Sequence, residues 1–236
     1  MESPGTKGDL AYRRLRDRIL AGELGPGDVI PQRELAAEIG ISTTPLREGL
    51  RRLESEGLIT LDAHKTARVA ALRAEEARDL YELRRALDPM AASLAAERRS
   101  ARDLEAIRAA GRDLHALPVG ASVGQLIAHR QFHAAIYRAS HNGLLIATLD
   151  SLWDKADRYR MMALSVDRGQ PARDRKDEEH RLLVEHIAAG DRDNAARVML
   201  AHIDSSLALS AIERLDARAA GVRGGQASPN PPSAQA

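Results

Sequence analysis

Residues 35–47, near the N-terminus, read LAAEIGISTTPLR, and this stretch decides the fold of the first domain. Two helical patterns meet in it at Gly40, where a backbone with positive φ would let two helices join at a sharp angle. Pro45 falls in the first turn of the second helix, where its missing N–H costs nothing. The stretch is therefore typical of a helix-turn-helix.

The second of these helices has two different sides. Its apolar residues recur at helical spacing and are expected in the core: Leu46, Leu50 and Leu53. Thr43, Arg47 and Arg51 form a separate stripe that should face outward. An apolar rear with Thr and Arg projecting from the N-terminal half suits the DNA major groove. An ordinary amphipathic helix with a solvated arginine side is the alternative.

The neighbouring elements favour the DNA-binding interpretation. Periodicity and turn residues predict helices at 10–24, 32–39 and 43–57 and strands at 58–61 and 67–70. This order is that of a winged helix-turn-helix, to which we assign residues 1–72. We expect Arg47 to contact guanine through two hydrogen bonds, and other arginines to contact phosphates: Arg33, Arg51 and Arg52.

From Arg73 onward the pattern is purely helical. Helices are expected at 74–99, 101–116, 122–140, 143–166, 174–189 and 191–216. Their short connections predict an all-helical antiparallel bundle over residues 73–216, and hence a mainly α protein. Residues 217–236 are rich in Gly, Pro, Ser and Ala without an apolar face, which predicts a disordered tail.

Composition limits the possible functions of the 236-residue chain. It contains no cysteine, which excludes disulfides and thiolate metal sites and suits a cytoplasmic protein. We expect no membrane association, because no apolar run approaches ~18 residues. The net charge is only +1, and residues 1–72 hold eleven basic and eleven acidic side chains. Any DNA-binding surface must therefore come from local placement of charge.

Four histidines fall on the apolar sides of three expected helices: His129, His133, His180 and His202. His129 and His133 are four residues apart, the spacing with which one helix clamps a divalent metal ion. Ordinary core histidines are the alternative, but each buried ring would then need its own hydrogen-bond partner. The remaining histidines lack this pattern and are expected at the surface or at helix ends: His64, His115, His141 and His186.

Residues 26–59, PGDVIPQRELAAEIGISTTPLREGLRRLESEGLI, closely resemble the winged-helix domain of the GntR family of bacterial regulators. The resemblance implies operator contacts from Arg33, Ser42, Thr43, Thr44 and Arg47. It also implies contacts from the wing tip, which carries His64 and Lys65. Two positions depart from the family. Thr43 stands where an arginine usually reads guanine, and Thr66 stands where the wing commonly has glycine.

Residues 75–210 look like the FCD domain, the helical effector-binding partner in the FadR-like branch of that family. The resemblance rests on Arg84-Arg85-Ala86-Leu87-Asp88, Phe132-His133, Glu179-His180 and Ala201-His202-Ile203. Many FCD domains hold a divalent metal through one Asp and three His. Three of the histidines above match the family's histidines, whereas His129 occupies the Asp position. Such an imidazole-rich site favours Zn or Ni over Mg, Ca or Mn.

The resemblance implies a repressor that is released from DNA by a small organic acid or sugar acid. Arg84 is the candidate contact for an effector carboxylate, with a plain ion pair as the alternative. A two-fold homodimer would read a palindromic operator. A metal-dependent enzyme on a His-rich bundle is the rival function, but no acidic residue beside the histidine motifs has an obvious role as a base. A purely structural zinc site in a DNA-architectural protein is the third possibility.

Overall fold

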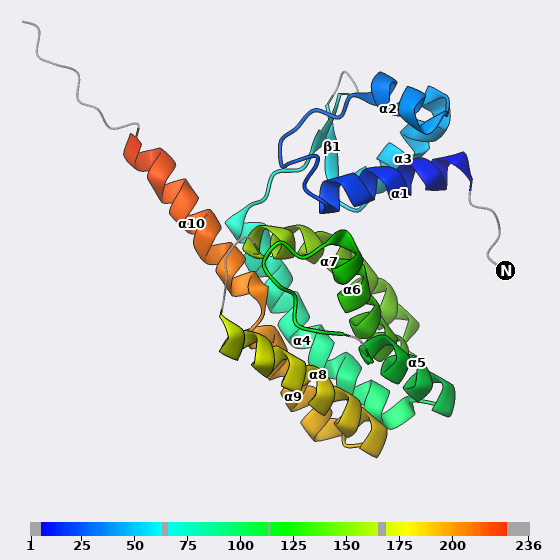
Figure 1. The fold of residues 1–236 in the computed structure, drawn as a ribbon, viewed down its shortest axis with the longest axis vertical. Helices are drawn as coiled ribbons and strands as arrows, with labels where there is room; N and C mark the ends of the chain where they lie inside the picture. Colours follow the sequence, from blue (N-terminus) through cyan, green and yellow to red (C-terminus); the bar gives the residue numbers. More distant parts are fainter. Residues whose placement is uncertain (1–5, 63–65, 113, 165–168, 226–236) are drawn as a thin grey trace, which may run out of the picture.

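A computed structural model of the chain describes residues 6–62, 66–112, 114–164 and 169–225. It is mostly helical, with a small antiparallel sheet near the N-terminus, and this confirms the predicted fold class. Figure 1 shows the N-terminal elements gathered beside one end of a helical bundle, with α1 lying next to α7.

The N-terminal elements form a winged helix-turn-helix: α1 (Lys7–Leu20), α2 (Gln32–Ile39), α3 (Thr43–Ser55), β1 (Ile59–Leu61) and β2 (Ala67–Val69). Gly40 ends α2 with φ of 71°, the left-handed conformation expected for the tight turn. The two strands pair antiparallel, with Ile59 opposite Val69. The three leucines of α3 are buried as expected: Leu46, Leu50 and Leu53.

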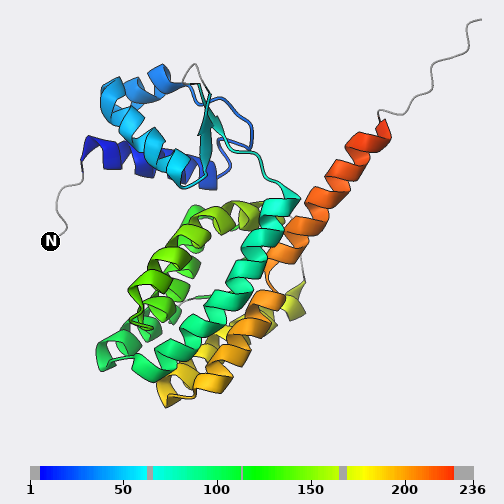
Figure 2. The ribbon, with the colours of Figure 1, turned by 180° about the vertical axis from the view of Figure 1, so that it is seen from behind.

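The remaining elements form the helical domain: α4 (Ala74–Arg98), α5 (Ala101–Gly111), α6 (Val123–Arg138), α7 (Gly143–Ala163), α8 (Gln170–Ala189), α9 (Arg192–Asp204) and α10 (Leu207–Gly225). The long helix α4 contacts five of the others: α6, α7, α8, α9 and α10. α10 extends past the bundle, and Figure 2 shows it beside α4 when the molecule is seen from behind.

The C-terminal part of the fold differs from the expectation in two ways. The helix expected over 191–216 is broken after α9, where Ser205 Oγ donates to the Ala201 carbonyl oxygen at 2.6 Å and so competes with the helical hydrogen bonds. α10 then continues to Gly225, so the disorder expected from residue 217 is wrong for residues 217–225. Residues 226–236 lie outside the described residues.

Residues Arg192–Arg218 are long and apolar enough to span a membrane by length and composition alone. In the structure, however, this stretch is divided between α9 and α10, which pack against α4. Its buried side chains, such as Val198, Ile203 and Ala211, belong to the apolar cores of the helical domain. The apolar character therefore has an explanation within the fold.

Close contact between α1 and α3 holds the winged helix-turn-helix together at Gly49. A Cβ at this position would lie 2.8 Å from the Tyr12 backbone nitrogen and 3.1 Å from Ala11 Cβ. A backbone atom cannot move aside as a flexible side chain can. The glycine is thus needed for the spacing of the two helices rather than for its backbone angles.

We predict that Gly49→Ala lowers the free energy of unfolding of the winged helix-turn-helix by about 1–3 kcal/mol, because the added methyl forces α1 and α3 apart. Urea denaturation followed by circular dichroism measures the change. Gly143→Ala is the matched control, since a Cβ there has no neighbour within 4 Å, and its stability should stay the same or rise slightly. Equal stability of the two variants would contradict the proposed close contact.

Candidate metal centre and nucleic-acid interface

The outward side of α3 carries the residues expected to meet DNA. Thr43, Thr44, Arg47 and Arg51 are all exposed. Arg33 on α2 is exposed as well, and it lines a surface hollow together with Thr43, Arg47 and Thr66 at the base of the wing. The structure thus brings residues from α2, α3 and the wing onto one face.

Two parts of the expected interface need separate comment. Ser42 is the exposed residue preceding α3, and its side chain makes no capping hydrogen bond with the helix. Its hydroxyl is therefore not committed to the helix terminus. The wing-tip residues His64 and Lys65 lie outside the described residues.

Arg52, a predicted phosphate contact, lies on a different side of α3 from Thr43. It lies nine residues after Thr43, which is about 180° around the helix. Its guanidinium group stacks over the Tyr12 ring at 3.7 Å and pairs with Glu56 at 3.2 Å and Asp9 at 3.5 Å. Arg52 therefore packs α3 against α1 on the side away from the expected DNA face, although 52% of its side chain is exposed. Its phosphate contact stays a prediction.

The four histidines of the helical domain meet in one buried cluster, as their helical spacing predicted. His129 and His133 come from α6, His180 from α8 and His202 from α9, and each side chain is at most 6% exposed. One ligand nitrogen from each ring can be chosen so that all four lie within 4.8 Å of one another. The neighbouring His129 and His133 ring centroids are 4.6 Å apart.

The hydrogen bonding of these rings is incomplete. Five buried ring nitrogens have no hydrogen-bond partner: Nδ1 of His129 and both nitrogens of His133 and His180. Burial is the main reason that the pKa of His129, His133 and His202 lies well below its ordinary value, and burial lowers the pKa of His180 to about 4. The rings are thus neutral at neutral pH, which is the form that binds metal.

The donor set fits a divalent cation. Four imidazoles from three helices match the ligand number of a zinc ion, and one ion would engage a nitrogen of each ring. Ordinary core histidines would have hydrogen-bond partners, which most of these ring nitrogens lack. The cluster can therefore hold a metal ion. The other described histidines lie apart from it, with His141 exposed and paired with Asp103 at 2.8 Å.

Two buried arginines lie beside the histidine cluster, on the ring of Trp153. Arg84 lies 4.1 Å and Arg160 4.5 Å from the Trp153 ring, which in turn contacts His133 with ring centroids 4.9 Å apart. Both arginines line a pocket shared with Tyr81 and Tyr159. None of the four histidines lines it, so Trp153 and the arginines connect the pocket to the cluster.

Both arginines are held by carboxylates. Arg84 Nε donates to Asp88, one turn further along α4, at 3.1 Å. This buried contact is the plain ion pair expected as the alternative role of Arg84. Arg160 Nη1 donates to Asp157 at 2.9 Å, and burial lowers the pKa of Arg160 to about 10. Sequence reasoning missed Arg160, although Trp153, Asp157 and Arg160 recur every three or four residues on one side of α7.

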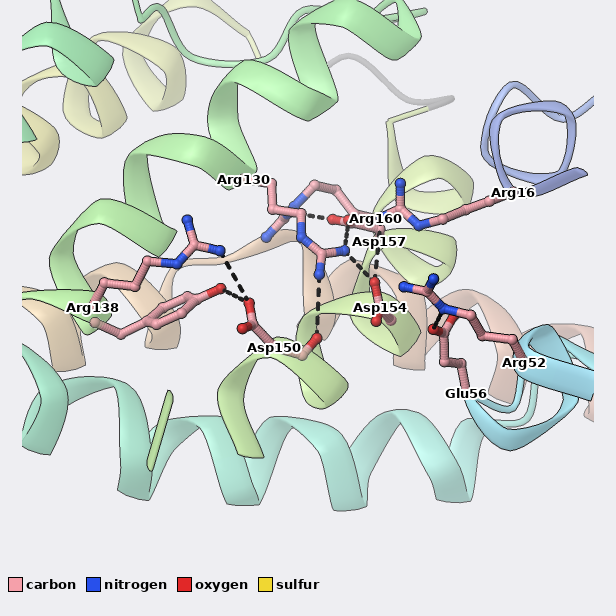
Figure 3. Close-up of polar contacts among 10 residues, drawn as sticks. Arg16, Arg52, Glu56, Arg130, Arg138, Asp150, Asp154, Asp157 and Arg160 are labelled. Carbon is pink, nitrogen blue, oxygen red and sulfur yellow. Dashed lines mark hydrogen bonds and ion pairs between the residues drawn. The ribbon is translucent and has the colours of Figure 1, made fainter. Parts of the chain in front are cut away.

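Ion pairs lead from this pocket to the winged helix-turn-helix, as Figure 3 shows. Asp157 also accepts from Arg130 on α6 at 3.4 Å, and Arg130 forms a second, shorter bond with Asp154. Asp154 in turn accepts from Arg16 of α1 at 3.3 Å. Arg158, also on α7, donates to backbone carbonyls of the N-terminal domain, including that of Gly57 at 2.9 Å. α7 therefore contacts both the pocket and the winged helix.

Comparison with known proteins agrees with this architecture. Residues 8–69 match the family described as bacterial regulatory proteins, gntR family, and residues 79–205 match the FCD domain. The Nta operon transcriptional regulator of Aminobacter aminovorans is 32% identical over 178 residues, covering 75% of this chain and 82% of the relative. The transcriptional repressor GlaR of Escherichia coli is 28% identical over 202 residues, covering 81% and 90%.

A solved structure shares the fold. The E. coli protein McbR/YncC superposes with a TM-score of 0.72 over 91% of this chain and 99% of its own, at 22% sequence identity. Sequence and structure thus agree on an N-terminal winged helix and a C-terminal FCD domain. This chain belongs to the GntR family of bacterial transcriptional regulators, in the branch that carries an FCD domain.

Proposed function

We propose that this protein is a cytoplasmic repressor that binds a palindromic operator and is released from it by a small carboxylate effector. The observation that carries the proposal is the buried four-histidine cluster beside an arginine-lined pocket, in contact with a winged helix through α7. One of the related proteins is itself named a transcriptional repressor.

The four histidines would hold the metal ion, with Zn or Ni as the ions best suited to imidazole nitrogen. A bound divalent ion supplies a positive charge that attracts an anion. In the surrounding structure, Arg84, Arg160 and Lys176 are offset by Asp88, Asp157 and Glu179, respectively. A metal ion would therefore leave the site with net positive charge, which favours an acidic effector.

The pocket offers donors for such an effector. Arg84 and Arg160 line the pocket, and each can donate to a carboxylate. These two guanidinium groups would be the contacts of an organic acid or sugar acid. Movement of Arg160 on effector binding would displace its partner Asp157. Asp157 and Asp154 both pair with Arg130, and Asp154 also pairs with Arg16 in the DNA-binding domain.

The same contacts weigh against an enzyme. A general base must be available to accept a proton from the substrate. Among the described residues, the buried carboxylates beside the cluster are already paired, Asp88 with Arg84, Asp157 with Arg160, and Glu179 with Lys176. A site with paired carboxylates and pocket-lining arginines suits binding better than proton transfer.

We further propose a homodimer, which would match the two-fold symmetry of a palindrome. The helical domain exposes large apolar side chains that a second copy could cover. Leu83 and Met90 on α4 are each 49% exposed, and Leu144 on α7 is 84% exposed. Sedimentation equilibrium with operator DNA should give two chains per palindrome, and one chain per palindrome would contradict the proposal.

The different roles proposed for Arg47 and Arg51 on α3 can be tested with an operator obtained by selecting bound DNA from a random library. Arg47→Ala should cost about 1–3 kcal/mol and relax base preference at one symmetric position of each half-site. Arg51→Ala should weaken binding to all sequences alike and reduce the salt dependence, because it removes a phosphate contact. Uniform loss in both variants would mean that Arg47 does not read a base.

The metal proposal predicts one Zn or Ni ion per chain after loading of protein purified without chelator or histidine tag. His133→Ala should lose this ion and the effector response but keep operator binding, because the winged helix is a separate unit. Elemental analysis and an operator-binding assay measure both effects. His141→Ala, which removes an exposed histidine, should retain the ion. Wild-type protein without stoichiometric metal would reduce the cluster to core histidines.

A further inference from the structure

Glu179 is a buried carboxylate directly beside the histidine cluster. It lies on α8 next to His180, and its side chain is 11% exposed. Its Oε2 atom lies 2.8 Å from Nδ1 of His202 and 2.7 Å from Nζ of Lys176, and its Oε1 atom lies 3.1 Å from Ser205 Oγ. Glu179 thus contacts a ring of the cluster without belonging to the four-histidine set.

The contact between Glu179 and His202 fixes which ring nitrogen of His202 can bind a metal ion. A carboxylate only accepts hydrogen bonds, so Nδ1 of His202 must carry the hydrogen. The lone pair of that ring is then on Nε2, which is left to face a metal ion. The other three rings differ, because Nδ1 of His129, His133 and His180 has no partner. His202 is therefore the ring of the cluster whose tautomer is already set.

Lys176 keeps Glu179 in place. Besides its bond to the carboxylate, Lys176 Nζ donates to the His202 carbonyl oxygen at 2.7 Å and to Ser205 Oγ at 2.6 Å. These bonds join α8 to the last turn of α9, which carries His202. Both the ring and the backbone of His202 are consequently held by the same pair of side chains.

We propose that Glu179 is a positioning residue, which orients His202 and strengthens its Nε2 atom as a metal ligand. A carboxylate on the far nitrogen of a ligating histidine holds the ring in place and raises its basicity. The inference rests on the proposed metal function of the four histidines.

A purely structural ion pair with Lys176 is the competing explanation of Glu179. Both explanations allow a loss of stability when the residue is changed. Only the positioning role also requires a change in metal affinity and in the protonation of one named ring nitrogen. Those two quantities therefore separate the explanations.

The experiment measures Zn affinity of the full chain by competition with a chromophoric chelator. Glu179→Gln keeps the size of the side chain but removes its charge, and it should weaken Zn binding by about 10- to 100-fold. Glu178→Gln is the matched control, because Glu178 is the neighbouring residue, is exposed and pairs only with Arg181 on the surface. Its Zn affinity should equal that of the wild type.

A second measurement needs neither metal nor a variant. In the metal-free wild-type protein labelled with ¹⁵N-histidine, two-bond proton–nitrogen correlation spectra should show His202 protonated at Nδ1. Protonation at Nε2 would overturn the proposal even if Glu179→Gln failed to fold.

The outcomes distinguish this inference from the proposed function. Zn binding by the wild type with undiminished affinity in Glu179→Gln would overturn the positioning role alone. Failure of the wild type to bind Zn would overturn both the positioning role and the metal centre. Weakened binding in Glu179→Gln, unchanged binding in Glu178→Gln and a hydrogen on Nδ1 of His202 would together support the inference.

Discussion

The burial of four imidazole rings with few hydrogen-bond partners is the constraint on which the helical domain depends. Each buried polar atom left without a partner costs about 1–3 kcal/mol, and five ring nitrogens of the cluster are in this state. A single divalent ion would engage one nitrogen of every ring and connect α6, α8 and α9. The cost of the metal-free cluster is thus a physical reason for these helices to hold a metal ion. The four candidate ligands are all imidazoles, and such a set would favour Zn or Ni over harder ions.

The helix α7 relates this site to the DNA-binding domain. Trp153, Asp157 and Arg160 of this helix lie against the histidine cluster and the pocket. Asp154 and Arg158, on other sides of the same helix, contact α1 and the backbone of the winged helix. Because a helix is a rigid element, a shift imposed on one side of α7 would be carried to the other side. This arrangement gives the proposed repressor a physical connection between effector binding and operator binding.

Local patterns in the sequence were enough to predict the winged helix and the cluster. Gly40 and the leucines of α3 follow from helix geometry, and the four histidines stand out because they interrupt apolar faces. Arg160 and Glu179 were not predicted as site residues, because a charged residue on a helix is usually solvated. Their burial depends on partners from other parts of the fold. The stacking of Arg52 on Tyr12 was not predicted either, because it requires the packing of α1 against α3.

The central claim is that four histidines bind one metal ion, and X-ray absorption spectroscopy of the Zn-loaded protein tests it most directly. The spectrum should show four imidazole nitrogens at about 2.0–2.1 Å, with the multiple scattering characteristic of histidine rings. One or two added oxygen ligands from water or a carboxylate are compatible with this result. A shell dominated by oxygen, with two or fewer imidazoles, would contradict it and return the cluster to the role of an unusually polar core.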